Sequence, residues 1–178
     1  MSDLTDAGHD QVENARIVLE TLGMDAERSN ERSGLVLLAL AGLTPSETWG
    51  HAANPMLGTR AIMDFIRDEY GKEYAPNTRE TVRRFTLHQF VEAQLVVQNP
   101  DQPTRPVNSP KWNYQITSEA LEVLRAYDTD AWTHTVDQYL EELPSSYGVA
   151  YGKRSKHAGI TVVVFPMGEL GYRACLPH

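Results

Sequence analysis

The stretch that decides the fold is YAPNTRETVRRFTLHQF, residues 74–90. Asn77 stands where a helix N-cap is expected, and Glu80 follows at the spacing of a capping box. We therefore predict a helix that starts after Asn77 and ends at about Ala93. Its apolar residues at helical spacing predict which side faces the core. This inner stripe consists of Val82, Phe85, Gln89, Phe90 and Ala93.

The outer side of this predicted helix is rich in arginine. Arg79 and Arg83 are one turn apart on one flank, and Arg84 lies on the outer face. A guanidinium group can pair with guanine O6 and N7 or grip a phosphate. Asn77 and Thr78 lie at the positive N-terminal end of the helix, which favours a phosphate. The alternative is a solvated charged face, because exposed ion pairs contribute little.

Downstream of this helix, residues 95–98 and 112–116 are predicted as two strands. The intervening residues 99–110 hold four prolines and are expected to form a loop. Arg105 and Lys111 lie in and beside this loop, where they are candidates for phosphate contact. Two further helices are expected after the strands, over residues 119–127, with Ser118 as the cap, and 131–143.

Upstream, residues 10–22, a segment from about residue 30 and residues 60–70 are predicted as helices. The apolar run 35–41 predicts that the second helix is central to the core. The order helix, helix, recognition-type helix, strand, loop, strand, helix predicts a mainly α fold. We interpret it as a winged helix-turn-helix with a small two-stranded wing.

Length, charge and cysteine content exclude several classes of protein. The chain has 178 residues and a formal net charge of −8. Between Lys72 and Lys111 there are six basic and four acidic residues, so this segment carries 6 − 4 = +2 within an acidic protein. Cys175 is the only cysteine, which excludes an internal disulfide and a cysteine zinc cluster. The polar N-terminus is unlike a secretory signal, and no apolar run is long enough for a membrane span. We expect a cytoplasmic protein.

The segment 74–90 resembles the N-terminal domain of BsuBI/PstI-type restriction endonucleases. The similarity covers about residues 15–132 and includes residues 30–33, 37–45, 54–58 and 105–111. The resemblance implies an N-terminal helix-turn-helix domain that binds double-stranded DNA. It also implies a C-terminal nuclease domain with a magnesium-dependent PD-(D/E)xK core. Family members cut both strands of a short palindromic site, and whether this chain forms a homodimer stays open.

The sequence lacks the nuclease signature. A PD-(D/E)xK site needs an acid two positions before a lysine, together with another acid, to hold magnesium. The residues two positions before the four lysines are Tyr70, Ser109, Tyr151 and Arg154. We therefore expect no catalytic residue, no metal site and no cofactor in this chain, and assign the family's magnesium to a nuclease domain that it does not contain.

The predicted organisation has three parts. They are a flexible N-terminal tail (1–9), the winged helix-turn-helix DNA-binding domain (10–143), and a connector or tail (144–178). Whether the third part is cut short before a nuclease domain stays open. A second basic cluster, Lys153, Arg154, Lys156 and His157, falls in the third part, where we expect a solvated tail. Two other functions stay open, a free-standing regulator of a restriction-modification operon and a helical protein-interaction domain. An active endonuclease with a divergent site in residues 144–178 is disfavoured because Glu169 is the only acid there.

Overall fold

The structure is a computed structural model that describes residues 4–143, 153–157, 160–166 and 172–175. About half of the described residues are helical, and far fewer lie in strands. The helices are α1 (Asp6–Thr21), α2 (Glu31–Ala41), α3 (Thr59–Tyr70), α4 (Thr78–Val82), α5 (His88–Glu92), α6 (Ser118–Ala126) and α7 (Trp132–Glu142), with a 3₁₀ turn η1 (Trp49–His51) and a π-helical turn η2 (Arg83–Leu87). The strands β1 (Val96–Gln98) and β2 (Tyr114–Ile116) form a small antiparallel sheet. This confirms a mainly helical fold with a two-stranded sheet.

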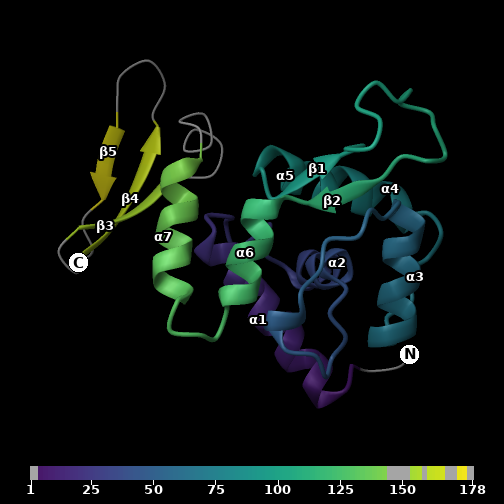
Figure 1. The fold of residues 1–178 in the computed structure, drawn as a ribbon, viewed down its shortest axis with the longest axis horizontal. Coiled ribbons are helices and arrows are strands. Elements are labelled where there is room, and N and C mark those ends of the chain that lie inside the picture. The colour runs from purple at the N-terminus through teal and green to yellow at the C-terminus, as the bar shows by residue number, and fades with distance from the viewer. Residues whose placement is uncertain (1–3, 144–152, 158–159, 167–171, 176–178) are drawn as a thin grey trace.

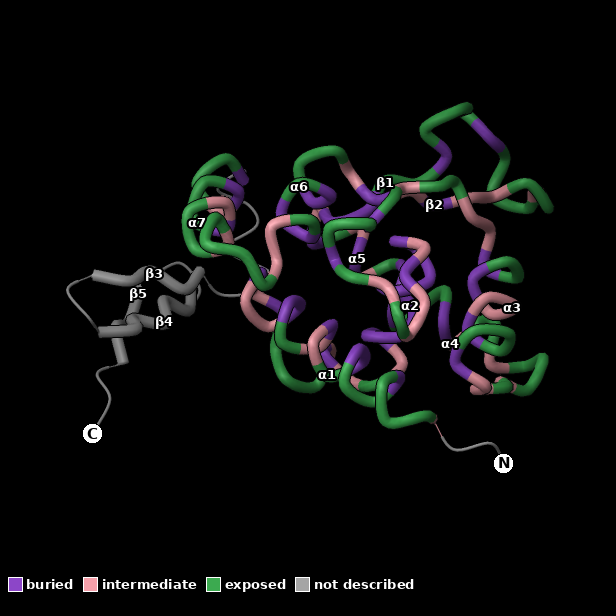
Figure 2. Tube along the Cα trace, turned by 60° about the horizontal axis from the view of Figure 1, so that its bottom comes forward, coloured by how far each residue is buried: buried purple, intermediate pink, exposed green. Residues whose placement is uncertain are grey.

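The helix α2 lies at the centre of the helical part (Figure 1), and its turns are buried (Figure 2). Every residue from Ser33 to Ala41 is buried, because this run is apolar on all sides and other elements pack around it. Gly34 allows α1 to approach closely, since a Cβ there would lie 3.1 Å from the Val12 carbonyl oxygen. The helix ends at Gly42, whose left-handed conformation closes the last turn.

Two helix starts differ from the sequence prediction. The helix α1 begins at Asp6, so the expected tail 1–9 is too long. The Thr5 side chain caps this helix by accepting a hydrogen bond from the Gly8 amide at 3.1 Å. The helix α6 is capped by Thr117, one residue before the expected Ser118, through a 3.2 Å hydrogen bond from the Ala120 amide.

The elements α4, η2 and α5 follow one another without a break, and we call residues 78–92 the basic helix. Its predicted span is confirmed. It follows α3 after the left-handed Gly71 and a short connector. The Tyr70 hydroxyl donates to the Leu43 carbonyl oxygen at 2.7 Å, which ties α3 to the end of α2. The Arg32 Nε on α2 donates to the buried Thr86 hydroxyl at 3.1 Å and so fixes the middle of the basic helix.

The two strands pair as Val96 with Ile116 and Gln98 with Tyr114. They are joined by residues 99–113, which we call the proline loop. This loop projects from the helical body beside α4 (Figure 1). Leu57 pairs with the free side of Tyr114 through two backbone hydrogen bonds of 2.9 Å, so the segment before α3 also contacts this sheet.

The C-terminal segment is not all connector. The strands β3 (Lys153–His157), β4 (Ile160–Pro166) and β5 (Tyr172–Cys175) form an antiparallel sheet in the order β3-β4-β5. The expectation of a tail is therefore wrong for these strands, because the run of β-branched residues in β4 favours a strand. Within the described ranges, no helix is long and apolar enough to cross a membrane.

Candidate nucleic-acid interface

The start of the basic helix differs in detail from the predicted capping box. Asn77 has helical backbone angles and makes no side-chain cap hydrogen bond. The amides of Thr78 and Arg79 instead donate to the carbonyl oxygens of Ala75 and Pro76, at 2.9 and 3.3 Å. A turn that already bends before the helix takes over the role of the cap. The side chain of Asn77 is thereby left at an exposed surface.

Glu80 turns toward the arginines and not back to the cap. The Arg83 Nε and Nη2 donate to its two carboxylate oxygens at 2.9 and 2.7 Å, and the Arg84 Nε lies 3.2 Å away. The hydrogen bond from Arg83 holds the pKa of the Glu80 carboxyl below its ordinary value. All three side chains are about half exposed or more, so these pairs are readily exchanged for other partners.

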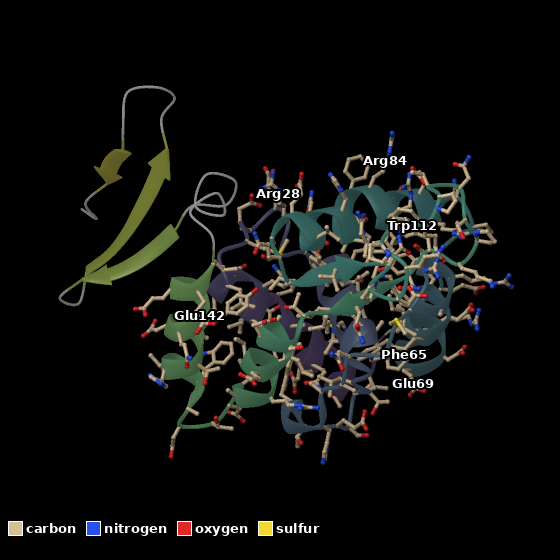
Figure 3. All side chains as sticks on the ribbon, turned by 45° about the horizontal axis from the view of Figure 1, so that its top comes forward. Arg28, Phe65, Glu69, Arg84, Trp112 and Glu142 are labelled. Atoms are coloured by element: carbon tan, nitrogen blue, oxygen red, sulfur yellow. The ribbon has the colours of Figure 1, made fainter. Side chains whose placement is uncertain are left out.

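The Arg84 side chain points away from the body of the protein (Figure 3). Arg79 is also exposed, and among the described residues it has no ion-pair partner within bonding distance. The three arginines predicted for this surface therefore all lie on the outside of the basic helix. The structure brings them together with one carboxylate, Glu80, which is shared by two of them.

A groove of about 620 Å³ lies between the basic helix and the proline loop. Arg79 and Arg83 line the helix side of it, and the polar residues Asn108 and Ser109 line the loop side. The groove thus joins two segments that were predicted separately as DNA-contacting. The lining residues that were not predicted as part of a site include Thr59, Val107 and Trp112.

Arg105 is a correction to the predicted interface. Its side chain is buried inside the proline loop, because its charge is satisfied there. It donates to the Asp101 carboxylate at 2.6 and 3.1 Å, to the Asn99 side chain at 3.1 Å and to the Lys111 carbonyl oxygen at 2.8 Å. These bonds hold the pKa of Asp101 at about 2, chiefly through the hydrogen bonds from Arg105 and Asn113. Arg105 shapes the loop, and it is not placed to meet a ligand.

Lys111 has the opposite arrangement. Its backbone is held at both ends, since its carbonyl oxygen accepts from Arg105 and its amide donates to the Ser109 hydroxyl at 3.2 Å. Its side chain is exposed. The loop therefore presents the Lys111 ammonium to solvent from a backbone that is held by two hydrogen bonds.

The sequence misplaced one prominent residue, Phe85. It was predicted to point inward, yet 56% of it is exposed, while Leu87 is fully buried. The cause is the π-helical turn η2, which changes the rotation of the helix between Val82 and Leu87. Val82 and Leu87 are five residues apart, which is the hydrogen-bond spacing of a π turn, but only the structure shows that both are buried.

The second basic cluster, Lys153 to His157, lies on β3. Its side chains are outside the described part of the structure. Among the described residues, no group of three or more histidine, cysteine, aspartate or glutamate side chains is placed to hold a metal ion.

Comparison with known proteins identifies relatives of this chain. Residues 9–146 match the family described as the BsuBI/PstI restriction endonuclease HTH domain. The chain is 49% identical over 137 residues to the type II restriction enzyme BsuBI of Bacillus subtilis. It is 33% identical over 126 residues to the type II restriction enzyme AplI of Arthrospira platensis. These matches cover 77% and 71% of this chain but only 43% and 39% of the relatives, so the chain matches less than half of their length.

A solved structure is also similar. The SdaI restriction endonuclease matches with a TM-score of 0.73 and 29% identity, over 94% of this chain and 51% of that one. By its sequence match, the chain belongs to the BsuBI/PstI restriction endonuclease HTH domain family.

Proposed function

We propose that this chain binds double-stranded DNA as the recognition domain of a type II restriction endonuclease of the BsuBI/PstI kind. The observation that carries the proposal is the groove in which Arg79 and Arg83 face the polar residues of the proline loop. One wall is a helix narrow enough to enter a major groove, and the other is a loop suited to the adjacent phosphates. The relatives are named as type II restriction enzymes, which supports DNA as the partner.

The proposed docking is that of a winged helix-turn-helix, with α3 and the basic helix as the helix pair and the proline loop as the wing. The pairing of Leu57 with Tyr114 supports this, because it adds a short extended segment between α2 and α3 beside the two wing strands. In this arrangement Arg79, Arg83 and Arg84 contact base edges or phosphates. Asn77 and Thr78 at the helix start and Lys111 on the wing contact the DNA backbone.

A salt titration tests the proposal. Each phosphate neutralised by a lysine or arginine releases counterions, so the logarithm of the affinity falls with the logarithm of salt concentration by about 0.9 per contact. Three arginines and one lysine predict a slope of about −3 to −4 per chain. Fluorescence anisotropy of labelled duplexes at several salt concentrations measures it. The proposal fails if no duplex binds at low salt. Binding to a protein partner with an affinity that does not change with salt would instead favour a protein-interaction domain.

We further propose that this chain binds DNA without cutting it. The support is its own sequence, since no acid stands two positions before any lysine and Glu169 is the only acid between residues 144 and 178. Magnesium in this family would align water and polarise the scissile phosphate, but the residues present here do not supply its ligand set. Incubation of excess chain with plasmid and magnesium or manganese is expected to give no discrete linear product. Specific double-strand cleavage by highly purified chain would refute this.

A homodimer on a two-fold symmetric site follows from the same proposal, because a palindrome presents each half-site twice. Sedimentation with a palindromic duplex should give two chains of 20.0 kDa per duplex. One chain per duplex would favour binding as a monomer. A cytoplasmic location, where the DNA of a bacterial cell lies, belongs to this proposal as well.

A further inference from the structure

Phe85 is the large apolar side chain that the basic helix exposes. It is 56% exposed, whereas its apolar neighbours Val82, Leu87 and Phe90 are fully buried. A single exposed apolar residue is common on protein surfaces and needs no special explanation. Its position on this helix distinguishes Phe85 from the other exposed apolar residues, such as Ile17 on α1.

Phe85 is exposed by a rare backbone feature. It lies at the middle of the π-helical turn η2, and such turns inside α-helices are frequent at functional sites. The turn is fixed from behind, where Arg32 donates to Thr86 and Leu87 is buried. The Phe85 side chain is therefore presented by an anchored backbone and not by a frayed end.

Phe85 follows two exposed arginines. Arg83, Arg84 and Phe85 are exposed in succession, so the ring is the next exposed side chain after Arg84. An arginine pair and an aromatic ring thus belong to one exposed stretch of the basic helix. In that stretch the arginines are suited to guanine and phosphate, but the ring can offer only an apolar contact.

The edges of the base pairs in a major groove carry one apolar group, the 5-methyl of thymine. We infer that Phe85 contacts this methyl group and selects thymine at one position of the bound DNA. This inference rests on the proposed function, because it requires the basic helix to lie in the major groove. It adds a specificity-determining residue that works by apolar contact beside the arginines.

The test removes the methyl group from the DNA. A preferred duplex is first selected from a random pool with the full chain, and each thymine is then replaced in turn by deoxyuridine. Loss of one methyl contact is worth about 0.8 kcal/mol, so affinity should fall about fourfold at one position. In Phe85→Ala the same replacement should have no effect, since the partner is already gone. Phe85→Leu, which keeps an apolar side chain, should retain part of the effect.

Ile17→Ala is the matched control, because it removes an exposed apolar side chain from α1 and should keep the full deoxyuridine penalty. The wild-type chain tests whether a thymine methyl is contacted at all, and Phe85→Leu tests the role of Phe85 if Phe85→Ala does not fold. Binding in which no thymine is preferred, or in which Phe85→Ala keeps the whole penalty, overturns the inference and leaves DNA binding intact. Absence of binding to any duplex would instead remove the proposed function together with this inference.

Discussion

Two arginine–carboxylate pairs of almost equal length have different roles in the basic helix and the proline loop. Arg83 lies 2.7 Å from Glu80, and Arg105 lies 2.6 Å from Asp101. The side chain of Arg83 is 46% exposed, whereas that of Arg105 is 6% exposed and makes further bonds to the loop. A short ion pair therefore does not show whether an arginine is free for a ligand. Burial and the number of other partners decide it.

The largest effect is expected for Arg105→Ala. Removal of the guanidinium takes away four hydrogen bonds, two to the Asp101 carboxylate, one to the Asn99 side chain and one to the Lys111 carbonyl oxygen. The free energy of unfolding should fall by about 1.5–3 kcal/mol, the range for hydrogen bonds to a charged group, because the Asp101 carboxylate left behind is partly exposed. Urea denaturation monitored by tryptophan fluorescence measures this, because Trp112 lies in the proline loop.

The control for that variant is Lys111→Ala. Only the backbone of Lys111 is engaged by Arg105, so this change should leave stability unaltered while it weakens binding to all duplexes alike. Equal loss of stability in both variants would mean that the loop is fragile as a whole. The contrast between the two regions would then be lost.

The next effect is on binding. Arg83→Ala, Arg84→Ala and Arg79→Ala should each leave folding intact, because these side chains are exposed. A residue that reads guanine should lose about 1–3 kcal/mol of binding free energy and relax the preference at one base, whereas a phosphate contact should weaken all sequences together. Selection of bound sequences with each variant separates the two cases. Unchanged affinity in all three variants would mean that the basic helix is not the DNA-binding surface.

The sequence predicted the elements better than the roles of their side chains. The apolar run of α2 and the prolines between β1 and β2 act through local rules, so those elements are where periodicity put them. Phe85 was misplaced because a wheel of 100° per residue holds only for a regular α-helix, and η2 departs from it. Arg105 was misread because its burial depends on Asp101 and Asn99, and a charged residue in a loop is exposed by default.

A third prediction concerns pH. The pKa of Asp101 is held at about 2, below its ordinary 3.8, by the hydrogen bonds from Arg105 and Asn113. A lowered pKa in the folded state means that this contribution to stability is complete above about pH 3.8 and is lost as the pH falls toward 2. Carbon-detected NMR of the Asp101 carboxyl should show this midpoint in the wild type and a higher one in Arg105→Ala. Arg83→Ala should raise the pKa of Glu80 and leave that of Asp101 unchanged. A midpoint near 3.8 for Asp101 in the wild type would contradict the buried network.

The smallest expected effect is a change in DNA affinity, and its sign should differ between the two ion pairs. Glu80→Gln and Asp101→Asn each remove one negative charge and keep the shape of the side chain. Glu80 competes with phosphate for Arg83 and Arg84, so Glu80→Gln should raise affinity for any duplex by about twofold to fivefold, the range of an exposed ion pair. Asp101→Asn should lower affinity, because the proline loop loses the partner of its buried arginine. Anisotropy titrations at one salt concentration measure both. If Glu80→Gln weakens binding and relaxes the preference at one base, its carboxylate accepts from cytosine N4 and is a reader itself. The exposed pair of Glu80 and Arg83 would then act as a DNA-reading unit, and exposure alone would not show that Arg83 is free for DNA.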